Sequence, residues 1–189
     1  MAGTDGQVYI RFLNNGDEEA FRFLYEKYRE GLVRFLYGMV QNIEDAEELM
    51  MDTFAVLISG TAHYTVRKDA EFKTWLYAVA RNQARVFLRR HREMPVAPEN
   101  MDCEQLSPEP GPESMVLSDE RKIKLWQAMQ SLHTEYRQVL YLTYYEDMSP
   151  SGIARIMQKT VKQVYNLSTR AKAALKENLE GTGEIWDIL

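Results

Sequence analysis

The chain has little of what builds disulfide scaffolds, metal sites or membrane spans, since its 189 residues include one cysteine and three histidines. A lone Cys103 cannot form an internal disulfide, and His63, His91 and His133 lack the spacing of zinc ligands. No apolar run approaches the roughly 18 residues of a membrane span, and the first residues lack the basic-then-apolar layout of a signal peptide. We therefore expect a cytoplasmic protein with no metal and no membrane insertion.

Catalytic arrangements are also missing. No Ser-His-Asp or Cys-His pattern suggests a nucleophile with its base, and no motif indicates a cofactor or a small-molecule substrate. The composition is otherwise that of a folded globular protein, with 45% hydrophobic and 27% charged residues. The sequence predicts a folded protein that is not an enzyme.

Charge is segregated along the chain. The net charge of -5 argues against nucleic-acid binding by the chain as a whole, but it does not exclude basic segments that bind nucleic acid. Residues 17–54 hold ten acids against four bases, whereas residues 81–92 hold five arginines and residues 154–176 hold six bases, both without an acid. We expect two surfaces for a polyanion and one for a basic partner.

Prolines divide the chain into two units. Five of the six prolines lie between Met94 and Glu113, where no helical periodicity is visible. Proline fixes φ, removes an amide donor and disfavours helix in the preceding residue, so the segment predicts an extended, flexible linker. It separates an N-terminal unit of about 90 residues from a C-terminal unit of about 65.

The N-terminal unit has the pattern of three amphipathic helices. Apolar residues three and four apart mark the first helix, from Phe21 to Met39. Asn42 is the predicted N-cap of a second helix, which carries acids in its first turn and ends at Gly60. After a predicted loop at 61–70, a third helix starts at Phe72 and runs into the arginines.

The C-terminal unit has the pattern of a helix-turn-helix preceded by two helices, at about 116–130 and 135–145. Ser149 and Pro150 predict the N-cap and the first residue of a short helix. Residues 160–163, Thr-Val-Lys-Gln, form a capping-box sequence that opens a longer, basic helix.

The last helix has an apolar side, with Val161, Val164 and Leu167, and a polar side. Amide and guanidinium groups on the polar side can pair with base edges, and lysines can meet phosphates. A solvated surface helix would carry similar residues, but the lack of any acid over residues 154–176 of an acidic chain favours DNA contact. The predicted contacts are Arg155, Lys159, Thr160, Lys162, Gln163, Tyr165, Asn166, Thr169, Arg170 and Lys172.

Four stretches resemble the extracytoplasmic-function (ECF) RNA polymerase sigma factors, group 4 of the sigma-70 family. They are residues 17–28, 45–54, 72–82 and 149–175, and the third, Phe-Lys-Thr-Trp-Leu-Tyr-Ala-Val-Ala-Arg-Asn, is the most specific. The resemblance implies an all-α fold of two small helical domains, a region 2 bundle and a region 4 helix-turn-helix, joined by the flexible proline-rich linker. It also implies a protein that directs core RNA polymerase to specific promoters and initiates transcription.

By the same resemblance, the acidic second helix docks on the basic clamp helices of the polymerase, and the flap region is a second polymerase contact. Charge alone leaves a solvated acidic face, or a helix N-terminus favoured by the macrodipole, as the alternative. The residues implied for polymerase binding are Glu44, Asp45, Glu47, Glu48, Leu49, Asp52 and Phe54.

The third helix and the loop before it are implied to bind the minus-10 element. Arg81, Arg85 and Arg89 are four residues apart and can form a stripe against one phosphate backbone. Tyr64 can stack on an extruded base or tuck against its own domain, and Trp75 is expected in the core. The implied contacts are His63, Tyr64, Lys68, Asn82, Arg85, Arg89 and Arg90.

We expect residues 1–93 to form region 2, which binds polymerase and recognises and melts the minus-10 element. Residues 116–179 are expected to form region 4, which recognises the minus-35 element. Residues 94–115 are the expected linker, and residues 180–189 a tail. The expected partners are core RNA polymerase, promoter DNA and an anti-sigma factor, which can hold the protein at the membrane. A conventional helix-turn-helix regulator with a sensing or dimerising N-terminal bundle is the main alternative, and a helical protein-binding adaptor is another.

Overall fold

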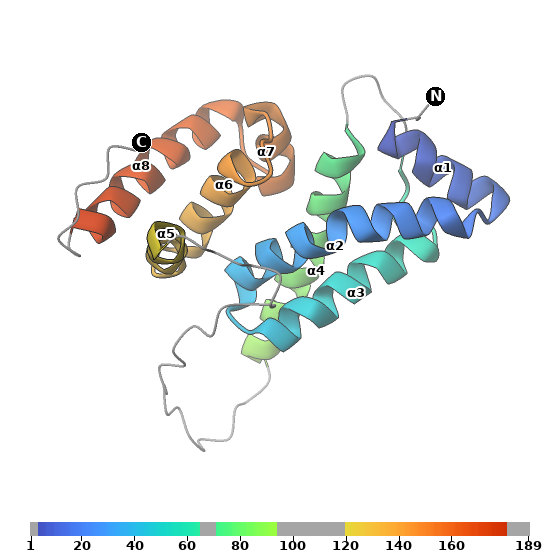
Figure 1. Cartoon of the computed structure of the whole chain (residues 1–189), viewed down its shortest axis with the longest axis horizontal. Helices are drawn as coiled ribbons and strands as arrows, with labels where there is room; N and C mark the ends of the chain where they lie inside the picture. Colours follow the sequence, from blue (N-terminus) through green and yellow to red (C-terminus); the bar gives the residue numbers. More distant parts are fainter. Residues whose placement is uncertain (1–3, 65–70, 94–119, 181–189) are drawn as a thin grey trace, which may run out of the picture.

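The computed structural model describes residues 4–64, 71–93 and 120–180, and these form eight α-helices and no strand (Figure 1). The helices are α1 (Asp5–Asn15), α2 (Glu18–Val40), α3 (Ile43–Ile58), α4 (Phe72–Glu93), α5 (Glu120–Gln130), α6 (Thr134–Tyr144), α7 (Pro150–Met157) and α8 (Val161–Glu180). The predicted all-α class is confirmed. The predicted linker at 94–115 and residues 181–189 of the predicted tail lie outside the described residues.

Helices α2 and α3 form the centre of the N-terminal half, and α1 and α4 pack against them. Asp17 and Asn42 cap α2 and α3, since their side-chain oxygens accept backbone amides of the first turn at 3.0 Å. The Asn42 cap is therefore confirmed, and α3 ends at Ile58, just before the predicted Gly60. The core of this half includes five leucines that are 0% exposed, namely Leu24, Leu32, Leu36, Leu57 and Leu76.

Helix α1 is not among the helices that the sequence pattern predicts. Its signal is a capping box, in which Thr4 and Gln7 bond reciprocally at 3.0 and 3.4 Å. Tyr9 anchors the helix, because its side chain is fully buried and its hydroxyl donates to the Leu57 carbonyl at 3.0 Å. The helix has only 11 residues, and the sequence prediction passed over both its capping box and its apolar residues.

The C-terminal half contains the predicted helix-turn-helix. Ser149 Oγ accepts a backbone amide of the first turn of α7 at 3.2 Å, and Pro150 is the first residue of that helix. Gln158 ends α7 in the left-handed conformation, with φ of 56°, which turns the chain toward α8. Thr160 and Gln163 bond reciprocally at 3.2 and 2.7 Å, so the predicted capping box is confirmed.

The remaining predicted boundaries agree with the structure within a few residues. The helices predicted at 116–130 and 135–145 correspond to α5 and α6, although 116–119 lie outside the described residues. Of the predicted loop at 61–70, residues 61–64 are not helical and the rest lies outside the described residues.

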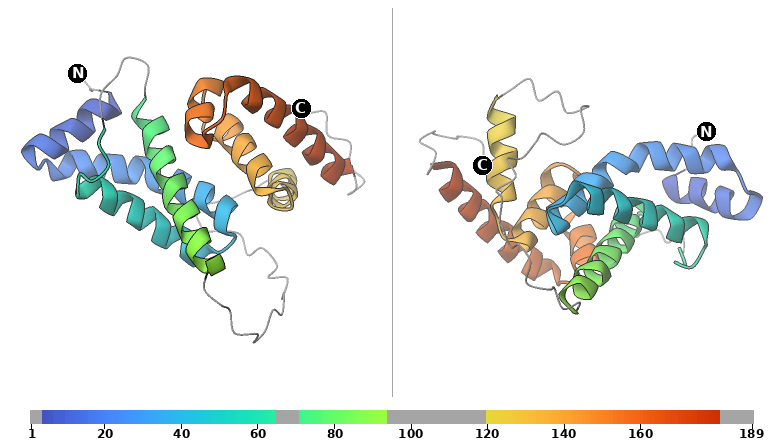
Figure 2. Two further views of the ribbon diagram at one scale, coloured as in Figure 1. Left: turned by 180° about the vertical axis from the view of Figure 1, so that it is seen from behind. Right: turned by 90° about the horizontal axis from the view of Figure 1, so that it is seen from below.

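The two halves pack against each other (Figure 2). Helix α4 lies against α7, and α2 lies against α6. Buried apolar residues of both halves belong to one hydrophobic cluster, which includes Phe35 and Tyr141 with ring centroids 6.2 Å apart. The two predicted units are therefore in contact rather than separated.

Candidate nucleic-acid and protein interfaces

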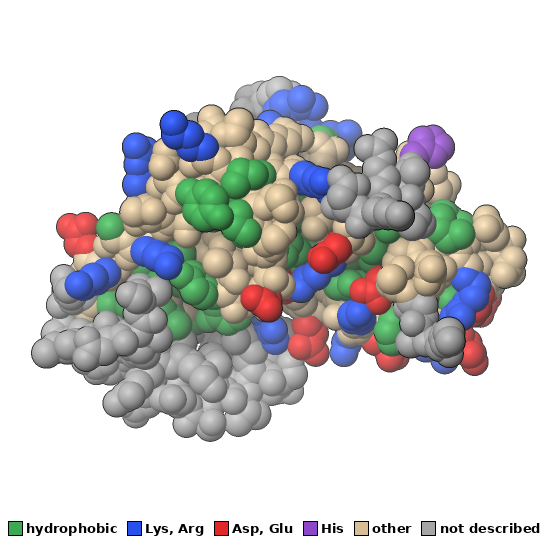
Figure 3. Space-filling view, turned by 90° about the horizontal axis from the view of Figure 1, so that it is seen from above, with side chains coloured by type: hydrophobic (Ala, Val, Ile, Leu, Met, Phe, Trp, Pro, Cys, Tyr) green, Lys and Arg blue, Asp and Glu red, His purple; other side chains and the backbone are tan. Residues whose placement is uncertain are grey.

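The outer side of the helix-turn-helix holds the predicted DNA contacts of the C-terminal half. Figure 3, a view from above, shows Lys and Arg side chains over the left part of the molecule, which the C-terminal helices form. Lys159 and Lys172 are half-buried. The other eight predicted contacts are exposed, namely Arg155, Thr160, Lys162, Gln163, Tyr165, Asn166, Thr169 and Arg170.

Neighbouring groups restrict some of these side chains. Gln163 Oε1 accepts from the Thr160 amide, so the side-chain oxygen is held at the start of α8 and the amide nitrogen is left as the donor for another partner. Lys159 forms an ion pair with Glu135 at 3.0 Å, and the Lys172 ammonium lies 5.3 Å from the Tyr144 ring centroid.

Val161 is not on the buried side of α8 as predicted. It is 41% exposed, because the buried side of this helix begins one turn later with Val164, which is 3% exposed. Val161 therefore adds an apolar group to the outer side of the helix.

Helix α4 presents its basic residues differently from the prediction. Asn82, Arg85, Arg89 and Arg90 are exposed, as a nucleic-acid contact requires. The expectation that Arg81 continues the exposed stripe is wrong, because this side chain is 8% exposed and is covered by the C-terminal half.

Hydrogen bonds fix two of the α4 arginines to the C-terminal half. Arg81 Nε donates to Gln138 Oε1 of α6 at 2.9 Å, and Arg85 Nη1 donates to Gln158 Oε1 at the end of α7 at 2.9 Å. Burial lowers the pKa of Arg81, and the neighbouring Arg85 guanidinium adds to this shift. The inner end of the arginine row is therefore engaged within the molecule.

The loop before α4 brings Tyr64 onto an aromatic cluster. The Tyr64 ring lies 5.1 Å from Trp75, 5.5 Å from Phe72 and 5.8 Å from Tyr9, measured between centroids. Tyr64 and Trp75 are both half-buried, so Tyr64 is tucked against its own domain and Trp75 packs on the core cluster. His63 is exposed, and Lys68 lies outside the described residues.

Helix α3 presents an acidic outer face. Glu44, Glu47, Glu48 and Asp52 are exposed, and Asp45 is half-buried. These five predicted polymerase contacts stand close together on one helix, where a basic partner can reach them.

Leu49 and Phe54, also predicted to bind polymerase, are 3% and 2% exposed. Direct contact by these two residues is not compatible with this structure, because they point into the bundle and fill the core. The large apolar residues that α3 does expose are Met51 and Ile58, at 55% and 56% exposure, and Ile43 at its first position, at 38%. For Met51, the signal that could have identified it is an apolar residue between Glu48 and Asp52 on the acidic side of the helix.

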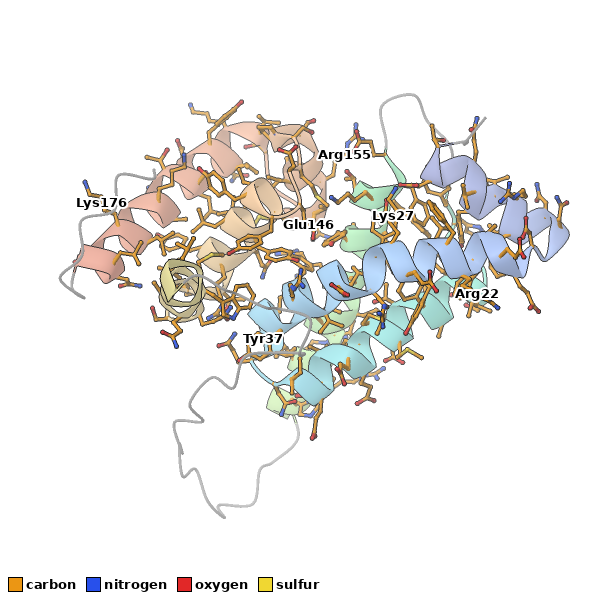
Figure 4. The ribbon with its side chains drawn as sticks, viewed as in Figure 1. Arg22, Lys27, Tyr37, Glu146, Arg155 and Lys176 are labelled. Carbon is orange, nitrogen blue, oxygen red and sulfur yellow. The ribbon has the colours of Figure 1, made fainter. Side chains whose placement is uncertain are left out.

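An apolar groove continues this surface at the far end of α3. Its volume is about 440 Å³, and it is lined by Phe12, Glu18, Phe21, Arg22, Tyr25 and Ile58. Figure 4 shows the labelled Arg22 near the start of α2, beside α3. The outer face of α3 thus changes from acidic in its first half to apolar in its second.

Buried tyrosines connect the helices beneath these surfaces. Burial raises the pKa of Tyr28, and its hydrogen bond to Asp5 adds to the shift. Burial likewise raises the pKa values of Tyr77 and Tyr141, and the nearby Glu146 carboxylate adds to both shifts. Among these neutral phenols, Tyr28 donates a hydrogen bond to Asp5 and Tyr141 donates one to Glu146.

The described part of the chain contains no group of three His, Cys, Asp or Glu residues that could hold a metal ion. Among the same residues, no helix has the length and apolar character that crossing a membrane requires.

Two family models match the chain. The model described as Sigma-70 region 2 matches residues 24–94, and the one described as Sigma-70, region 4, matches residues 122–175. The first covers most of α2–α4, and the second covers α5–α7 and most of α8.

Relatives align over nearly the whole chain. RNA polymerase sigma-H factor of Pseudomonas aeruginosa is 28% identical over 182 residues, which cover 92% of this chain and 93% of the relative. ECF RNA polymerase sigma factor SigW of Bacillus subtilis is 25% identical over 90% of this chain and 94% of its own length. ECF RNA polymerase sigma-E factor of Escherichia coli K12 is 25% identical over 92% of this chain and 94% of its own length.

Two solved structures share the fold. CnrH in complex with the cytosolic domain of CnrY has a TM-score of 0.66 at 19% identity, covering 95% of this chain and 99% of that one. The sigma factor RpoE in complex with the anti-sigma factor NepR from Bartonella quintana has a TM-score of 0.61 at 19% identity, covering 85% of this chain and 96% of that one.

Proposed function

We propose residue-level roles for a chain that belongs to the sigma-70 family and is an RNA polymerase sigma factor of the extracytoplasmic-function type. Such a factor directs core RNA polymerase to promoters and initiates transcription. The conventional helix-turn-helix regulator is not favoured, because the region 2 match accounts for the N-terminal half that the regulator would use for sensing or dimerising. We propose in addition that the chain has no catalytic activity of its own.

The minus-35 element is assigned to α8. The observation that carries this assignment is an exposed face with no acid over residues 161–176, on the second helix of a helix-turn-helix. Asn166 is exposed and can pair with a base edge, while Lys162 and Arg170 are placed to neutralise phosphates. Because Gln163 also caps the helix, Asn166 is the stronger candidate for base reading.

The minus-10 element is assigned to the outer end of α4. Asn82, Arg89 and Arg90 are exposed there, and Arg85 adds a fourth group when it leaves Gln158. Guanidinium groups can follow a phosphate backbone and stack on unpaired bases. Tyr64 can serve as a stacking surface only after it leaves the aromatic cluster around Trp75.

Polymerase docking is assigned to the outer face of α3. Glu44, Glu47, Glu48 and Asp52 would meet the basic clamp helices, and the exposed Met51 and Ile58 replace Leu49 and Phe54 as apolar contacts. Acids steer a basic partner, while exposed apolar side chains supply area that becomes buried on docking. The flap region is the proposed polymerase contact of the C-terminal half.

The division of the chain follows from these assignments. Residues 1–93 act as region 2 and 116–179 as region 4, with 94–115 as the linker and 180–189 as a tail. The sigma factors in the two similar solved structures are bound to CnrY and to the anti-sigma factor NepR, which supports an anti-sigma partner here. The protein then works in the cytoplasm, where polymerase is, and a membrane-bound partner can hold it at the membrane.

The test is transcription in vitro with core RNA polymerase and a random promoter library. Transcripts are expected to start downstream of one shared pair of promoter elements, and only when the chain is added. Glu48→Lys should reduce retention of core polymerase, whereas Glu177→Lys, an equal charge change at an exposed position of α8, should not. Failure of core polymerase to be retained by the unaltered chain at low salt would refute the proposal.

A further inference from the structure

Helix α1 contacts the chain on both sides of the connection between α3 and α4. It packs against α2 and against the start of α4 (Figure 1). Its Tyr9 hydroxyl donates to the carbonyl of Leu57, near the end of α3, and the side chain is fully buried. The same ring lies 5.3 Å from Phe72 and 5.4 Å from Trp75, in the first turn of α4, measured between centroids. One side chain of α1 therefore touches the helix that precedes the connection and the helix that follows it.

Tyr64, within that connection, lies against the first turn of α1. A Cβ at Gly6 would come 2.2 Å from the Tyr64 hydroxyl oxygen and 3.0 Å from two of its ring carbons. Glycine is a poor helix residue, and Gly6 lacks the positive φ that would call for one. Its missing side chain therefore serves the close approach of Tyr64, since no larger residue fits while the ring keeps this position.

The first turn of α1 is itself fixed to α2. The Asp5 carboxylate accepts from the Lys27 ammonium at 2.8 Å and from the Tyr28 hydroxyl, and Figure 4 labels Lys27 on α2. The same carboxylate lies close to Tyr64, because it adds to the rise in the pKa of Tyr64 that burial causes. A ring that rests on this turn is therefore placed relative to the whole N-terminal bundle.

From this geometry we propose that α1 is a positioning helix for promoter opening, in which Gly6 and Tyr9 hold Tyr64 so that the chain before α4 is preset to receive the minus-10 element. The inference rests on the proposed assignment of that element to α4 and the loop before it. The Sigma-70 region 2 model begins at residue 24 and does not account for α1. In this role Tyr64 acts from its place on α1, as a positioning residue, and does not leave the cluster to stack on a base.

A preset chain binds an unpaired base at a lower entropy cost, because fewer backbone and side-chain states are lost at that step. Phe72 and Trp75 pack on the Tyr64 ring as well, so a methyl group at Gly6 has to push the ring off α1. The two roles of Tyr64 then predict opposite effects of Gly6→Ala. Anchoring predicts less promoter opening, whereas stacking predicts unchanged or greater opening, since the methyl group releases the ring.

Permanganate reactivity of unpaired thymines at the selected promoter measures this opening. With core polymerase, the full-length Gly6→Ala chain should give at least about 10-fold fewer open complexes than the unaltered chain. Retention of core polymerase and binding of minus-35 duplex should stay within about 2-fold, because α3 and α8 are distant from the change. Gly38→Ala is the matched control, since Gly38 lies within α2 and an added Cβ there meets open space.

A double-mutant cycle separates the contact from a loss of helix stability. Tyr64→Ala alone should reduce open complexes as Gly6→Ala does, because the anchor is lost. In the Tyr64→Ala background the added methyl group has room, so Gly6→Ala should cause no further fall. Tyr64→Phe keeps the ring against Tyr9 and Trp75 and should stay near the level of the unaltered chain.

Sequence preference gives a readout that a merely structural role would not produce. In a promoter library randomised at both elements, Gly6→Ala should flatten the preference at minus-10 and leave the preference at minus-35 unchanged. General destabilisation of the bundle would lower the yield of transcript from all promoters without changing which minus-10 sequence is chosen.

Two results would overturn the proposal. One is promoter opening by Gly6→Ala that equals or exceeds that of the unaltered chain. The other is an undiminished further fall when Gly6→Ala is added to Tyr64→Ala, which would mean that the methyl group acts elsewhere. If the unaltered chain forms no open complex with core polymerase, the proposed function fails and this inference with it, while urea unfolding of the same cycle still decides whether Gly6 and Tyr64 are in contact.

Discussion

Helices α4 and α8 are both basic, yet they differ in what lies against them. On α8, Lys162, Asn166 and Arg170 face solvent from the first turn onward. On α4, Arg81 is buried and Arg85 is bonded to the other half of the molecule, so only the outer end of the row is open. A run of like charge therefore identifies a surface, but the tertiary packing decides whether that surface is available.

The contrast predicts a sequence of events. The open α8 can meet duplex DNA in the free protein, whereas α4 needs the two halves to part. Binding energy from polymerase and promoter can supply that separation, because a partner that binds only the open form shifts the equilibrium toward it. The predictions below test the difference between the two helices.

Charge reversal should give the largest difference in DNA affinity between variants of α8 and variants of α4. Lys162→Glu with Arg170→Glu is expected to lower the affinity of the full-length free chain for duplex promoter DNA by about 100-fold at low salt, because two phosphate contacts become repulsive. Arg89→Glu with Arg90→Glu is the matched change on α4; because Arg81 is buried and Arg85 is bonded to Gln158, the open end of this row is too short to hold duplex DNA, and the affinity should stay within about 2-fold. Fluorescence anisotropy measures both, and equal losses would remove the distinction.

Loss of a single base contact should have the next largest effect, on the preferred promoter sequence. Asn166→Ala is expected to relax the preference at one minus-35 position by about 1 to 3 kcal/mol, since an exposed amide can pair with a base edge. Selection and sequencing of bound DNA by holoenzyme measures this preference. Gln163→Ala is the comparison, and it should also weaken the start of α8, because the side chain caps that helix. An unchanged sequence preference in Asn166→Ala would exclude the residue from base reading.

Capping residues should affect the stability of each half by similar amounts. Thr160→Ala at the start of α8 and Asn42→Ala at the start of α3 should each lower the free energy of unfolding by about 1 kcal/mol. Thr169→Ala, within α8, should change it by less than about 0.5 kcal/mol. Urea unfolding measures all three, and a Thr160→Ala variant as stable as Thr169→Ala would argue against the cap.

Alkaline pH should lower the free energy of unfolding gradually. Because the folded pKa values of Tyr77 and Tyr141 are raised, the folded protein keeps protons that the unfolded chain releases near pH 10. This contribution to stability is complete below about pH 10 and is lost as the pH rises further. Urea unfolding from about pH 8 to 11 should show the decline, with a shallower slope in Tyr141→Phe. A free energy of unfolding that stays constant over this range would contradict it.

Much of the fold follows from local signals in the sequence. Asn42, Ser149 and the capping box at Thr160 mark helix starts through their own side-chain chemistry, and they act there in the structure. The outer faces of α3 and α8 follow from the helical period together with charge. Helix α1 has a local signal too, the capping box at Thr4, which the sequence prediction missed; where the helix packs depends on Tyr9 reaching the distant Leu57 carbonyl.

The sequence did not reveal which of the predicted site residues are exposed and which are buried. Leu49 and Phe54 belong to a motif, yet the bundle buries them, and Met51 takes the exposed position nearby. Arg81 lies in the same basic run as Arg89, but its environment comes from Gln138, which is 57 residues away in the chain. Contacts between halves depend on packing that no local pattern encodes.

The central claim is that α8 is accessible to DNA in the free chain, whereas the inner side of α4 is covered. Footprinting of one selected promoter, with the free chain and with the holoenzyme, tests this claim most directly. We expect the free chain to protect the minus-35 element alone, weakly and only at low salt, and the holoenzyme to protect both elements and expose unpaired bases at minus-10. Protection of the minus-10 element by the free chain, or of a two-fold symmetric site without polymerase, would contradict the account.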